Sequence, residues 1–252
     1  MIKSYRNIDS QLACRIRLVM ADVDGTLIAS GDLLSPAVFK AIRCFEEVGI
    51  MVGLVSGRTL SGLESMASEL EISGPIIAEN GGVARLRVGS QIVDLGYSRQ
   101  PAIEALEELK KLFPGAIEER EDNKHRFVDM VFRSPGIDTD ELRSHLEGVE
   151  LLDSGYILHL MQKGISKGRT LMKLLPEIGD GTLSTTEAMV FGDSLTDLSL
   201  FEMFPQSVLV INPRLSSEHG ETLRNVARYT SELPSGEGFA EVAFHILGNR
   251  LA

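Results

Sequence analysis

Residues 18–27 read LVMADVDGTL, and this stretch decides the fold. Its first four residues, Leu18–Ala21, form an apolar run of strand length, which is typical of a strand covered on both faces of a parallel sheet. Four more apolar runs of similar length follow along the chain: Met51–Val55, Pro75–Ala78, Met189–Phe191 and Val208–Ile211. We therefore expect five buried, parallel strands.

Helical stretches lie between most of these runs. Ser35-Pro36 supplies an N-cap and a proline at the first helical position. Thr59–Leu70 carries apolar residues at helical spacing, and a third helix is predicted to begin near Ser166 and to end before Pro176. The alternation of strands and helices predicts a doubly wound α/β domain with a parallel sheet.

The middle of the chain has a different pattern, which predicts an α+β insert. It contains a predicted hairpin with strands over 83–87 and 91–95, helices over 101–113 and 139–146, and strands over 127–132, 149–152 and 156–161. We accordingly expect a polar N-terminal leader over residues 1–15, an α/β core over 16–82 and 164–252, and a small α+β cap over 83–163.

The composition excludes several classes of protein. With 43% hydrophobic and 24% charged residues, the chain is globular rather than disordered, collagenous or a coiled-coil rod. Its net charge of −11 argues against binding to nucleic acid or to an anionic membrane surface, because both select for Lys and Arg.

The cellular location is inferred from what the sequence lacks. Cys14 and Cys44 are too few for a disulfide scaffold and lack metal-site spacing. No apolar run approaches the ~20 residues that span a bilayer, and residues 1–15 lack the apolar centre of a secretion signal. We expect a cytoplasmic protein.

Polar residues and glycines follow the apolar runs, at the points where the strands end. These segments are Asp22-Val23-Asp24-Gly25-Thr26-Leu27, Ser56-Gly57-Arg58, Glu79-Asn80-Gly81-Gly82, Gly192-Asp193-Ser194-Leu195-Thr196-Asp197 and Asn212. Because open α/β sheets bind ligands at the carboxyl ends of their strands, we expect the segments to converge on one site.

Four carboxylates are predicted at this edge of the sheet, namely Asp22, Asp24, Asp193 and Asp197. Two carboxylates ~4 Å apart repel each other by roughly 4 kcal/mol at an effective dielectric constant of 20, so the cluster needs a cation. Oxygen ligands without a nearby His or Cys favour Mg²⁺ over zinc or copper.

A phosphate site is predicted beside the carboxylates. Lys167, at the start of a helix, offers a point charge, and the Ser56-Gly57 turn offers a hydroxyl and backbone N–H donors. A metal, a phosphate cradle and a carboxylate nucleophile together indicate phosphoryl transfer through an aspartyl phosphate.

These motifs resemble the four motifs of the haloacid dehalogenase-superfamily phosphatases, and they occur in the same order. The α+β insert, with Glu79-Asn80-Gly81-Gly82 before it, resembles the C2-capped sugar-phosphatase branch. The small cap, residues 156–167 (YILHLMQKGISK) and Gly236-Glu237-Gly238 resemble archaeal-type phosphoglycolate phosphatases.

The resemblance implies a role for each residue of the first three motifs. Asp22 is implied to be the nucleophile and a metal ligand. Asp24 is implied to be the general acid and base, and its backbone carbonyl to bind the metal. Ser56 and Lys167 are implied to hold the transferring phosphoryl group.

In the last motif, Asp193 is implied to ligate Mg²⁺ and Asp197 to ligate or buttress it. Thr196 stands where many members carry Asn, which argues against a side-chain hydrogen bond from this position. The segment Gly192–Asp197 with Phe201 also resembles trehalose-6-phosphate phosphatases.

The sequence favours a Mg²⁺-dependent phosphatase that acts on a small phosphate ester, with 2-phosphoglycolate as the leading substrate. Mannosyl-3-phosphoglycerate or another sugar phosphate, including trehalose 6-phosphate, is the alternative, and a phosphomutase ranks below both. A binding module without activity would be expected to lack one of the four motif residues Asp22, Asp24, Lys167 and Asp193, and none is missing. We expect a monomer or homodimer.

Four polar residues outside these roles have simpler interpretations. Asn80 either satisfies a turn or contacts a ligand. His159 is expected to be structural. Arg126 and Arg133 are expected to be exposed to solvent rather than to bind a substrate carboxylate.

Overall fold

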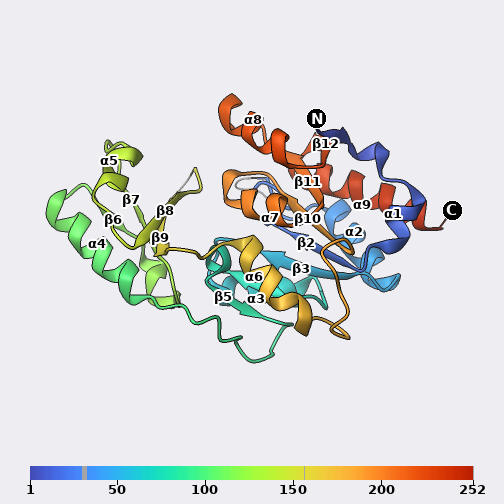
Figure 1. Ribbon diagram of the computed structural model, residues 1–252, viewed down its shortest axis with the longest axis horizontal. Coiled ribbons are helices and arrows are strands. Elements are labelled where there is room, and N and C mark those ends of the chain that lie inside the picture. Colours follow the sequence, from blue (N-terminus) through green and yellow to red (C-terminus); the bar gives the residue numbers. More distant parts are fainter. Residues whose placement is uncertain (30–32, 156, 252) are drawn as a thin grey trace.

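The structure is a computed structural model that describes residues 1–29, 33–155 and 157–251. Eight strands of the described chain form one sheet with the order β1-β12-β11-β10-β2-β3-β4-β5 (Figure 1). Their bounds are β1 Lys3–Ser4, β2 Leu18–Ala21, β3 Met51–Val55, β4 Ile76–Ala78, β5 Val83–Arg85, β10 Ala188–Gly192, β11 Gln206–Ile211 and β12 Tyr229–Pro234. All neighbouring pairs are parallel except β4 and β5.

Helices cover both faces of this sheet, which confirms the predicted doubly wound α/β class. One face carries α1 (Ser10–Arg15), α2 (Pro36–Glu47), α3 (Leu60–Glu69) and α9 (Ser235–Leu251). The other carries α6 (Lys167–Leu174), α7 (Leu198–Met203) and α8 (Ser217–Val226). In β2, Val19 packs against the first group and Met20 against the second, because successive side chains of a strand point to opposite faces. Both are fully buried, as the apolar run predicts.

A second, four-stranded antiparallel sheet lies to one side of the first (Figure 1). Its order is β6-β7-β9-β8, with β6 Glu118–Glu119, β7 Met130–Arg133, β8 Val149–Asp153 and β9 Leu158–Gln162. The helices α4 (Gln100–Leu112) and α5 (Thr139–Ser144) pack on it around Phe132 and Leu160. The short 3₁₀ turns are η1 Tyr5–Asn7, η2 Glu79–Gly81, η3 Glu121–His125, η4 Leu175–Glu177 and η5 Leu195–Asp197.

Two segments differ from the sequence-based expectation. The predicted hairpin over 83–95 contains only the strand β5, whose Arg85 forms an isolated bridge with Ile92. Because β5 pairs with β4, residues 83–85 join the large sheet rather than the insert. Tyr156, the first residue of the predicted strand over 156–161, lies outside the described residues.

The segment 1–15 is not separate from the large sheet. β1 pairs with β12, and α1 packs against α9. Tyr5, Ile8 and Leu12 are buried in the same core as the sheet. Their spacing of i, i+3 and i+7 is that of one helix face, although the structure divides the segment into β1, η1 and α1. In the part of the chain that the structure describes, no helix has the length and apolarity to cross a membrane.

The helices α6 and α7 approach each other closely at Gly168. A Cβ atom on Gly168 would overlap the backbone carbonyl oxygen of Ser199. The Gly168 N–H also donates a hydrogen bond to the Ser199 hydroxyl, at 3.1 Å. Glycine at this position therefore allows α6 to begin against α7, and it fixes the place of the preceding residue, Lys167.

We predict that Gly168→Ala lowers the free energy of unfolding by about 1–3 kcal/mol, because the added methyl group forces the two helices apart. Gly248→Ala is the matched control, since Gly248 lies in α9 with open space around it. Alanine favours a helix by up to about 1 kcal/mol over glycine, so this variant should be as stable as the wild type or more so. Urea denaturation measures both. Equal stability of Gly168→Ala and the wild type would contradict the close packing.

Candidate active site

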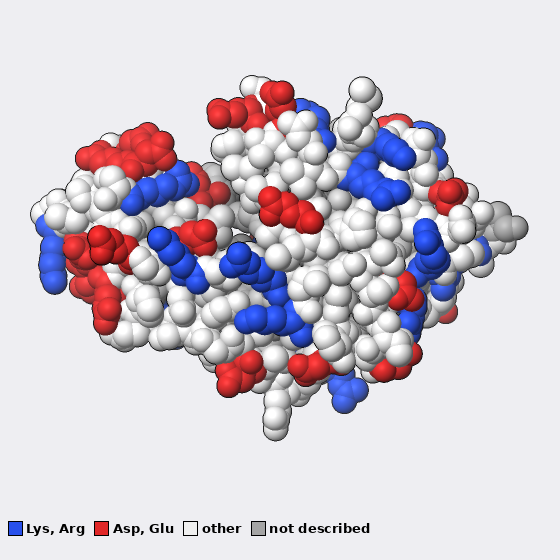
Figure 2. Space-filling view, viewed as in Figure 1, with Lys and Arg blue, Asp and Glu red and all other residues white. Residues whose placement is uncertain are grey.

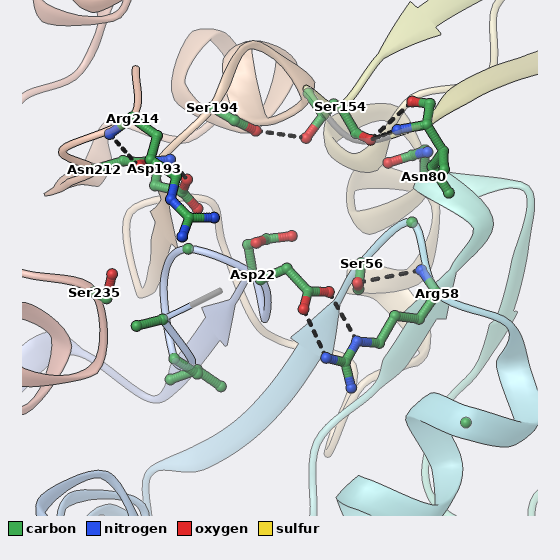
Figure 3. Close-up of a pocket in the computed structure, with 18 of the residues that line it drawn as sticks. Asp22, Ser56, Arg58, Asn80, Ser154, Asp193, Ser194, Asn212, Arg214 and Ser235 are labelled. Atoms are coloured by element: carbon green, nitrogen blue, oxygen red, sulfur yellow. Dashed lines mark hydrogen bonds and ion pairs between the residues drawn. The ribbon is translucent and has the colours of Figure 1, made fainter. Parts of the chain in front are cut away.

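A cavity lies between the carboxyl ends of the large sheet and the small sheet (Figure 3), and its volume is about 850 Å³. Asp22 follows β2, Ser56 follows β3, Asn80 follows β4 and Asp193 follows β10. Lys167 begins α6 and lines the same space. The structure thus brings the four predicted motifs together, as expected for the carboxyl edge of an open α/β sheet.

Lys167 is the centre of this arrangement. Its Nζ atom lies 2.6 Å from Asp22 Oδ1 and 2.7 Å from Asp197 Oδ1, and it donates to Thr196 Oγ1 at 3.1 Å. Burial alone would lower the pKa of Lys167, but Asp197 and Asp22 raise it above its usual value. Lys167 is therefore an ammonium group. The expectation that Thr196 makes no side-chain hydrogen bond is wrong.

Asp193 and Asp197 are each fixed by several donors. Thr26 Oγ1 and Asn212 Nδ2 both donate to the Asp193 carboxylate at 2.7 Å. Asp197 Oδ2 accepts the N–H groups of Asp193 and Ser194, at 3.0 and 3.1 Å. These bonds hold both carboxylates in one orientation toward the cavity floor.

Gly25 lets the β2 segment approach Asp193. Its φ angle is +101°, in the region that favours glycine, and a Cβ atom there would overlap the Asp193 carboxylate. Glycine is therefore required in the sequence DVDGTL both by its backbone conformation and by the close approach of Asp193.

The carboxylates form a group that fits a divalent cation. Within the described chain, Asp22, Asp193 and Asp197 each offer an oxygen atom, and these atoms lie within 4.8 Å of one another. Burial raises the pKa of Asp22 well above its usual range. Burial and the neighbouring charge of Asp197 raise the pKa of Asp193 to about 7. The single ammonium group of Lys167 thus balances only part of the negative charge of the three buried carboxylates. A hard cation that prefers oxygen ligands would balance the rest.

Asp24 is not part of this group. Its carboxylate is half-exposed and accepts two hydrogen bonds from Arg58, from Nε at 2.8 Å and from Nη2 at 2.6 Å (Figure 3). The side chain therefore lies at the mouth of the cavity. Only the backbone carbonyl of Asp24 was implied as a metal ligand, and that contact remains a prediction.

The Ser56-Gly57 turn offers donors to the cavity. Ser56 is buried, and its hydroxyl accepts the Arg58 N–H at 3.2 Å. Among the described residues, no acceptor contacts the Gly57 N–H. The Gly57 carbonyl accepts Arg126 Nη1 from the small sheet's side at 3.0 Å. A hydroxyl and a free N–H at the end of β3 match the predicted phosphate cradle in their chemistry.

Arg126 is buried, so the expectation that it is exposed is wrong. It forms an ion pair with Asp129 at 2.9 Å, and Asp129 is in turn bonded to His159 Nδ1 at 2.7 Å. Sequence reasoning missed Asp129 entirely. The available signal was an acidic residue between the apolar Val128 and Met130, because a carboxylate in such a strand is buried only with partners.

Glu79 joins the end of β4 to the segment that leads into β7. It is completely buried, and its carboxylate accepts the N–H groups of Phe127, Val128 and Asp129 at 2.7–3.1 Å. Burial and the charge of Asp129 raise the pKa of Glu79 to about 7, although the three N–H groups oppose the shift. The sequence singled out the motif but gave Glu79 no role.

The surface beside the junction of the two sheets is more basic than the net charge of −11 suggests. Figure 2 shows Lys and Arg side chains over α6, and basic and acidic side chains mixed over the small sheet and its helices. Arg169 and Lys173 belong to α6. Local cations of this kind favour the approach of an anionic molecule.

Residues 19–123 and 103–215 match the haloacid dehalogenase-like hydrolases. A phosphoglycolate phosphatase of Methanospirillum hungatei is 32% identical over 232 residues, which cover 90% of this chain and 95% of the relative. Its counterpart in Methanoculleus marisnigri is 34% identical over 232 residues, with 90% and 94% covered. The chain belongs to the haloacid dehalogenase-like hydrolases.

Solved structures agree with this assignment. A protein of Thermoplasma acidophilum has a TM-score of 0.80 and 27% identity, with 92% of this chain and 98% of that chain covered. The sucrose-phosphatase of Synechocystis, in complex with sucrose and phosphate, has a TM-score of 0.70 and 15% identity, with 91% and 97% covered. The second likeness concerns the fold alone. The predicted family and fold class are confirmed.

The raised pKa of Glu79 predicts a pH-dependent stability. The folded protein holds this proton more tightly than the unfolded chain, so the contribution of Glu79 is present below about pH 4.5 and is lost as the pH rises to about 7. The loss is at most about 3 kcal/mol. The variant Glu79→Gln should lack this component, which urea denaturation at a series of pH values measures.

The control for this prediction is Glu118→Gln, because Glu118 lies exposed on β6. It should keep the pH dependence of the wild type. If Glu79→Gln and the wild type lose stability in parallel between pH 5 and 7, Glu79 does not titrate in this window.

Proposed function

We propose that this hydrolase is a Mg²⁺-dependent phosphatase that cleaves a small phosphate ester through an aspartyl phosphate on Asp22, with 2-phosphoglycolate as its substrate. The observation that carries the proposal is the contact of 2.6 Å between Asp22 Oδ1 and the buried ammonium of Lys167. This contact places the Asp22 carboxylate in the cavity next to the ammonium group of Lys167, which a phosphoryl group also needs as a partner. The relatives named phosphoglycolate phosphatase support the substrate.

Asp22, Asp193 and the backbone carbonyl of Asp24 are proposed to hold Mg²⁺, and Asp197 to ligate or buttress it. The bound ion would neutralise the carboxylates and the phosphoryl oxygens. The fit rests on the oxygen-only donor set and on the raised pKa of Asp22 and Asp193.

The chain's own residues supply the remaining chemistry. Lys167, the Ser56 hydroxyl and the Gly57 N–H are proposed to bind the phosphoryl oxygens. An Asp22 oxygen attacks phosphorus, and the bond from phosphorus to the ester oxygen breaks. Asp24 gives its proton to the departing alkoxide. It then takes a proton from a water molecule, which attacks phosphorus, releases inorganic phosphate and restores Asp22.

Arg58 controls where Asp24 lies. As long as both Asp24 oxygens accept hydrogen bonds from Arg58, the carboxylate stays at the cavity mouth. We propose that Asp24 leaves Arg58 when a substrate fills the cavity and an ester oxygen becomes its partner. The part of the predicted cap that follows β5, residues 86–163, is proposed to act as the cap, because Arg126, Arg133 and His159 line the cavity from the small sheet's side.

A sugar phosphate is the second candidate substrate. The cavity of about 850 Å³ is larger than 2-phosphoglycolate requires, which favours a bulkier ester unless the cap closes further. A phosphomutase would pass the phosphoryl group from Asp22 to a second hydroxyl group instead of water. Release of inorganic phosphate, as opposed to an isomerised ester, separates the two reactions.

We predict that Asp22→Asn reduces phosphate release from 2-phosphoglycolate to the background rate, because the amide cannot attack phosphorus. Asp24→Asn should lose about 10²–10⁴-fold with this alkyl ester and much less with p-nitrophenyl phosphate, whose leaving group needs no proton. The measurement is kcat/KM for both esters and a panel of sugar phosphates in Mg²⁺. Turnover by Asp22→Asn would exclude the mechanism. A higher kcat/KM for a sugar phosphate than for 2-phosphoglycolate would make that sugar phosphate the proposed substrate instead.

Metal binding is predicted to show in stability, independently of activity. Mg²⁺ should raise the melting temperature of the wild type in proportion to the logarithm of its concentration. Asp193→Asn should lose this response, whereas Asp140→Asn should keep it, because Asp140 lies exposed on α5 in the small-sheet region. An unchanged response of Asp193→Asn would place the ion elsewhere.

A further inference from the structure

Asn80 has an unused hydrogen-bond donor in the wall of the cavity. The side chain is only 2% exposed, and its buried Nδ2 atom has no hydrogen-bond partner among the described residues. Its φ angle is +54°, a conformation that Asn tolerates better than most residues. In Figure 3, Asn80 lies between Ser154 and the loop with Ser56 and Arg58. Leaving a buried donor unpaired is costly, so this amide is suited to a ligand atom.

His159 reaches the same place from the small sheet. Its ring is buried and lines the cavity, and Nδ1 is fixed by Asp129 at 2.7 Å. Nε2 has no partner in the described parts of the chain, since Asp129 is the one hydrogen-bond contact of this ring. Burial alone would raise the pKa of Asp129, but His159 and Arg126 hold it below its usual value. Asp129 is therefore a carboxylate, and its bond to Nδ1 fixes the orientation of the imidazole ring.

Both side chains meet at Gly57. A Cβ atom on Gly57 would lie 3.0 Å from Asn80 Nδ2 and 3.1 Å from His159 Cε1. Gly57 follows Ser56, so the two side chains lie next to the proposed phosphate cradle. A group held there would be only a few atoms from the phosphorus of a bound ester.

We propose that Asn80 and His159 form a subsite for the carboxylate of the substrate. The inference rests on the proposed function and adds to it the residues that choose a carboxylated ester. Asn80 donates through Nδ2, and His159 donates through Nε2 while its Nδ1 donates to Asp129. A carboxylate has two oxygen atoms, so each donor receives one acceptor.

The test compares 2-phosphoglycolate with 2-hydroxyethyl phosphate, which has the same length but no carboxylate. Asn80→Gly keeps the backbone conformation and removes the donor, and His159→Gln replaces the imidazole with an uncharged amide. Each variant should lose about tenfold or more in kcat/KM with 2-phosphoglycolate, as expected for a hydrogen bond to a charged group. With 2-hydroxyethyl phosphate each should lose less than about threefold.

A negative charge introduced at position 80 distinguishes recognition of the substrate carboxylate from a structural role of Asn80. Asn80→Asp keeps the size of the side chain and should move the preference from 2-phosphoglycolate toward 2-aminoethyl phosphate, whose end is cationic. Merely loosening the loop would not exchange the two substrates. Arg133→Gln is the control, because Arg133 lines the same cavity and is the rival cation.

The outcomes distinguish the inference from the proposed function. Equal losses for all three esters, with melting temperatures unchanged, would mean that Asn80 and His159 serve the phosphoryl group or the loop, and would overturn the subsite. A selective loss in Arg133→Gln alone would assign the carboxylate to Arg133. Should the wild type release phosphate from 2-hydroxyethyl phosphate but not from 2-phosphoglycolate, the subsite is wrong and the phosphatase chemistry stands. No phosphate release from any ester would refute the proposed function itself.

Discussion

The buried ammonium of Lys167, held between Asp22 and Asp197, is the interaction on which the rest of the structure depends. Removing a charge from water is costly, and only partners of opposite charge at hydrogen-bond distance compensate it. Lys167 must therefore begin a helix at one fixed point, which requires Gly168 against α7. The carboxylates of Asp193 and Asp197 are in turn held by hydroxyl, amide and backbone N–H donors, and together with Asp22 they still carry surplus negative charge. The same electrostatic arrangement that costs stability thus prepares a site for a cation and a phosphoryl group.

Much of the site could be predicted because its residues sit at the ends of strands. A strand such as Leu18–Ala21 is buried on both faces, so its sequence alone reveals it, and the residues that follow are fixed by topology to one edge. Asp22, Ser56 and Asp193 were predicted by this reasoning, and Lys167 by its place at a helix start and by the family resemblance; all four line the cavity. Their convergence did not require knowledge of any side-chain conformation.

The parts that sequence reasoning missed depend on side-chain contacts and strand pairing that the hydrophobic pattern does not report. Arg126 was expected in solvent, yet Asp129, Asp122 and the Gly57 carbonyl all accept from its guanidinium group. Asp122 and Asp129 are near Arg126 in the sequence and Gly57 is distant, but no periodicity shows that the three acceptors meet around one buried guanidinium group. The pairing of β5 with β4 was missed because a short apolar strand can join either sheet.

The small sheet is tied to the large one by polar contacts rather than by a continuous apolar core. Glu79 accepts three N–H groups of the segment before β7, and Arg126 donates to the Ser56-Gly57 turn. Arg126 contacts the predicted phosphate cradle directly, and the Glu79 N–H donates to the carbonyl of Arg58, which follows it. A structural change in the cap therefore alters the place where the ester would bind. In this way the same chemistry of the core can be combined with different substrates.

The central claim is that Asp22 carries the phosphoryl group during turnover. The most direct measurement is mass spectrometry of Asp24→Asn quenched in acid during reaction with p-nitrophenyl phosphate and Mg²⁺. Because this variant lacks the base that activates water, we expect a covalent phosphate on the peptide with Asp22, formed together with a burst of p-nitrophenol. A phosphate on any other side chain, or a burst without covalent phosphate, would contradict the account.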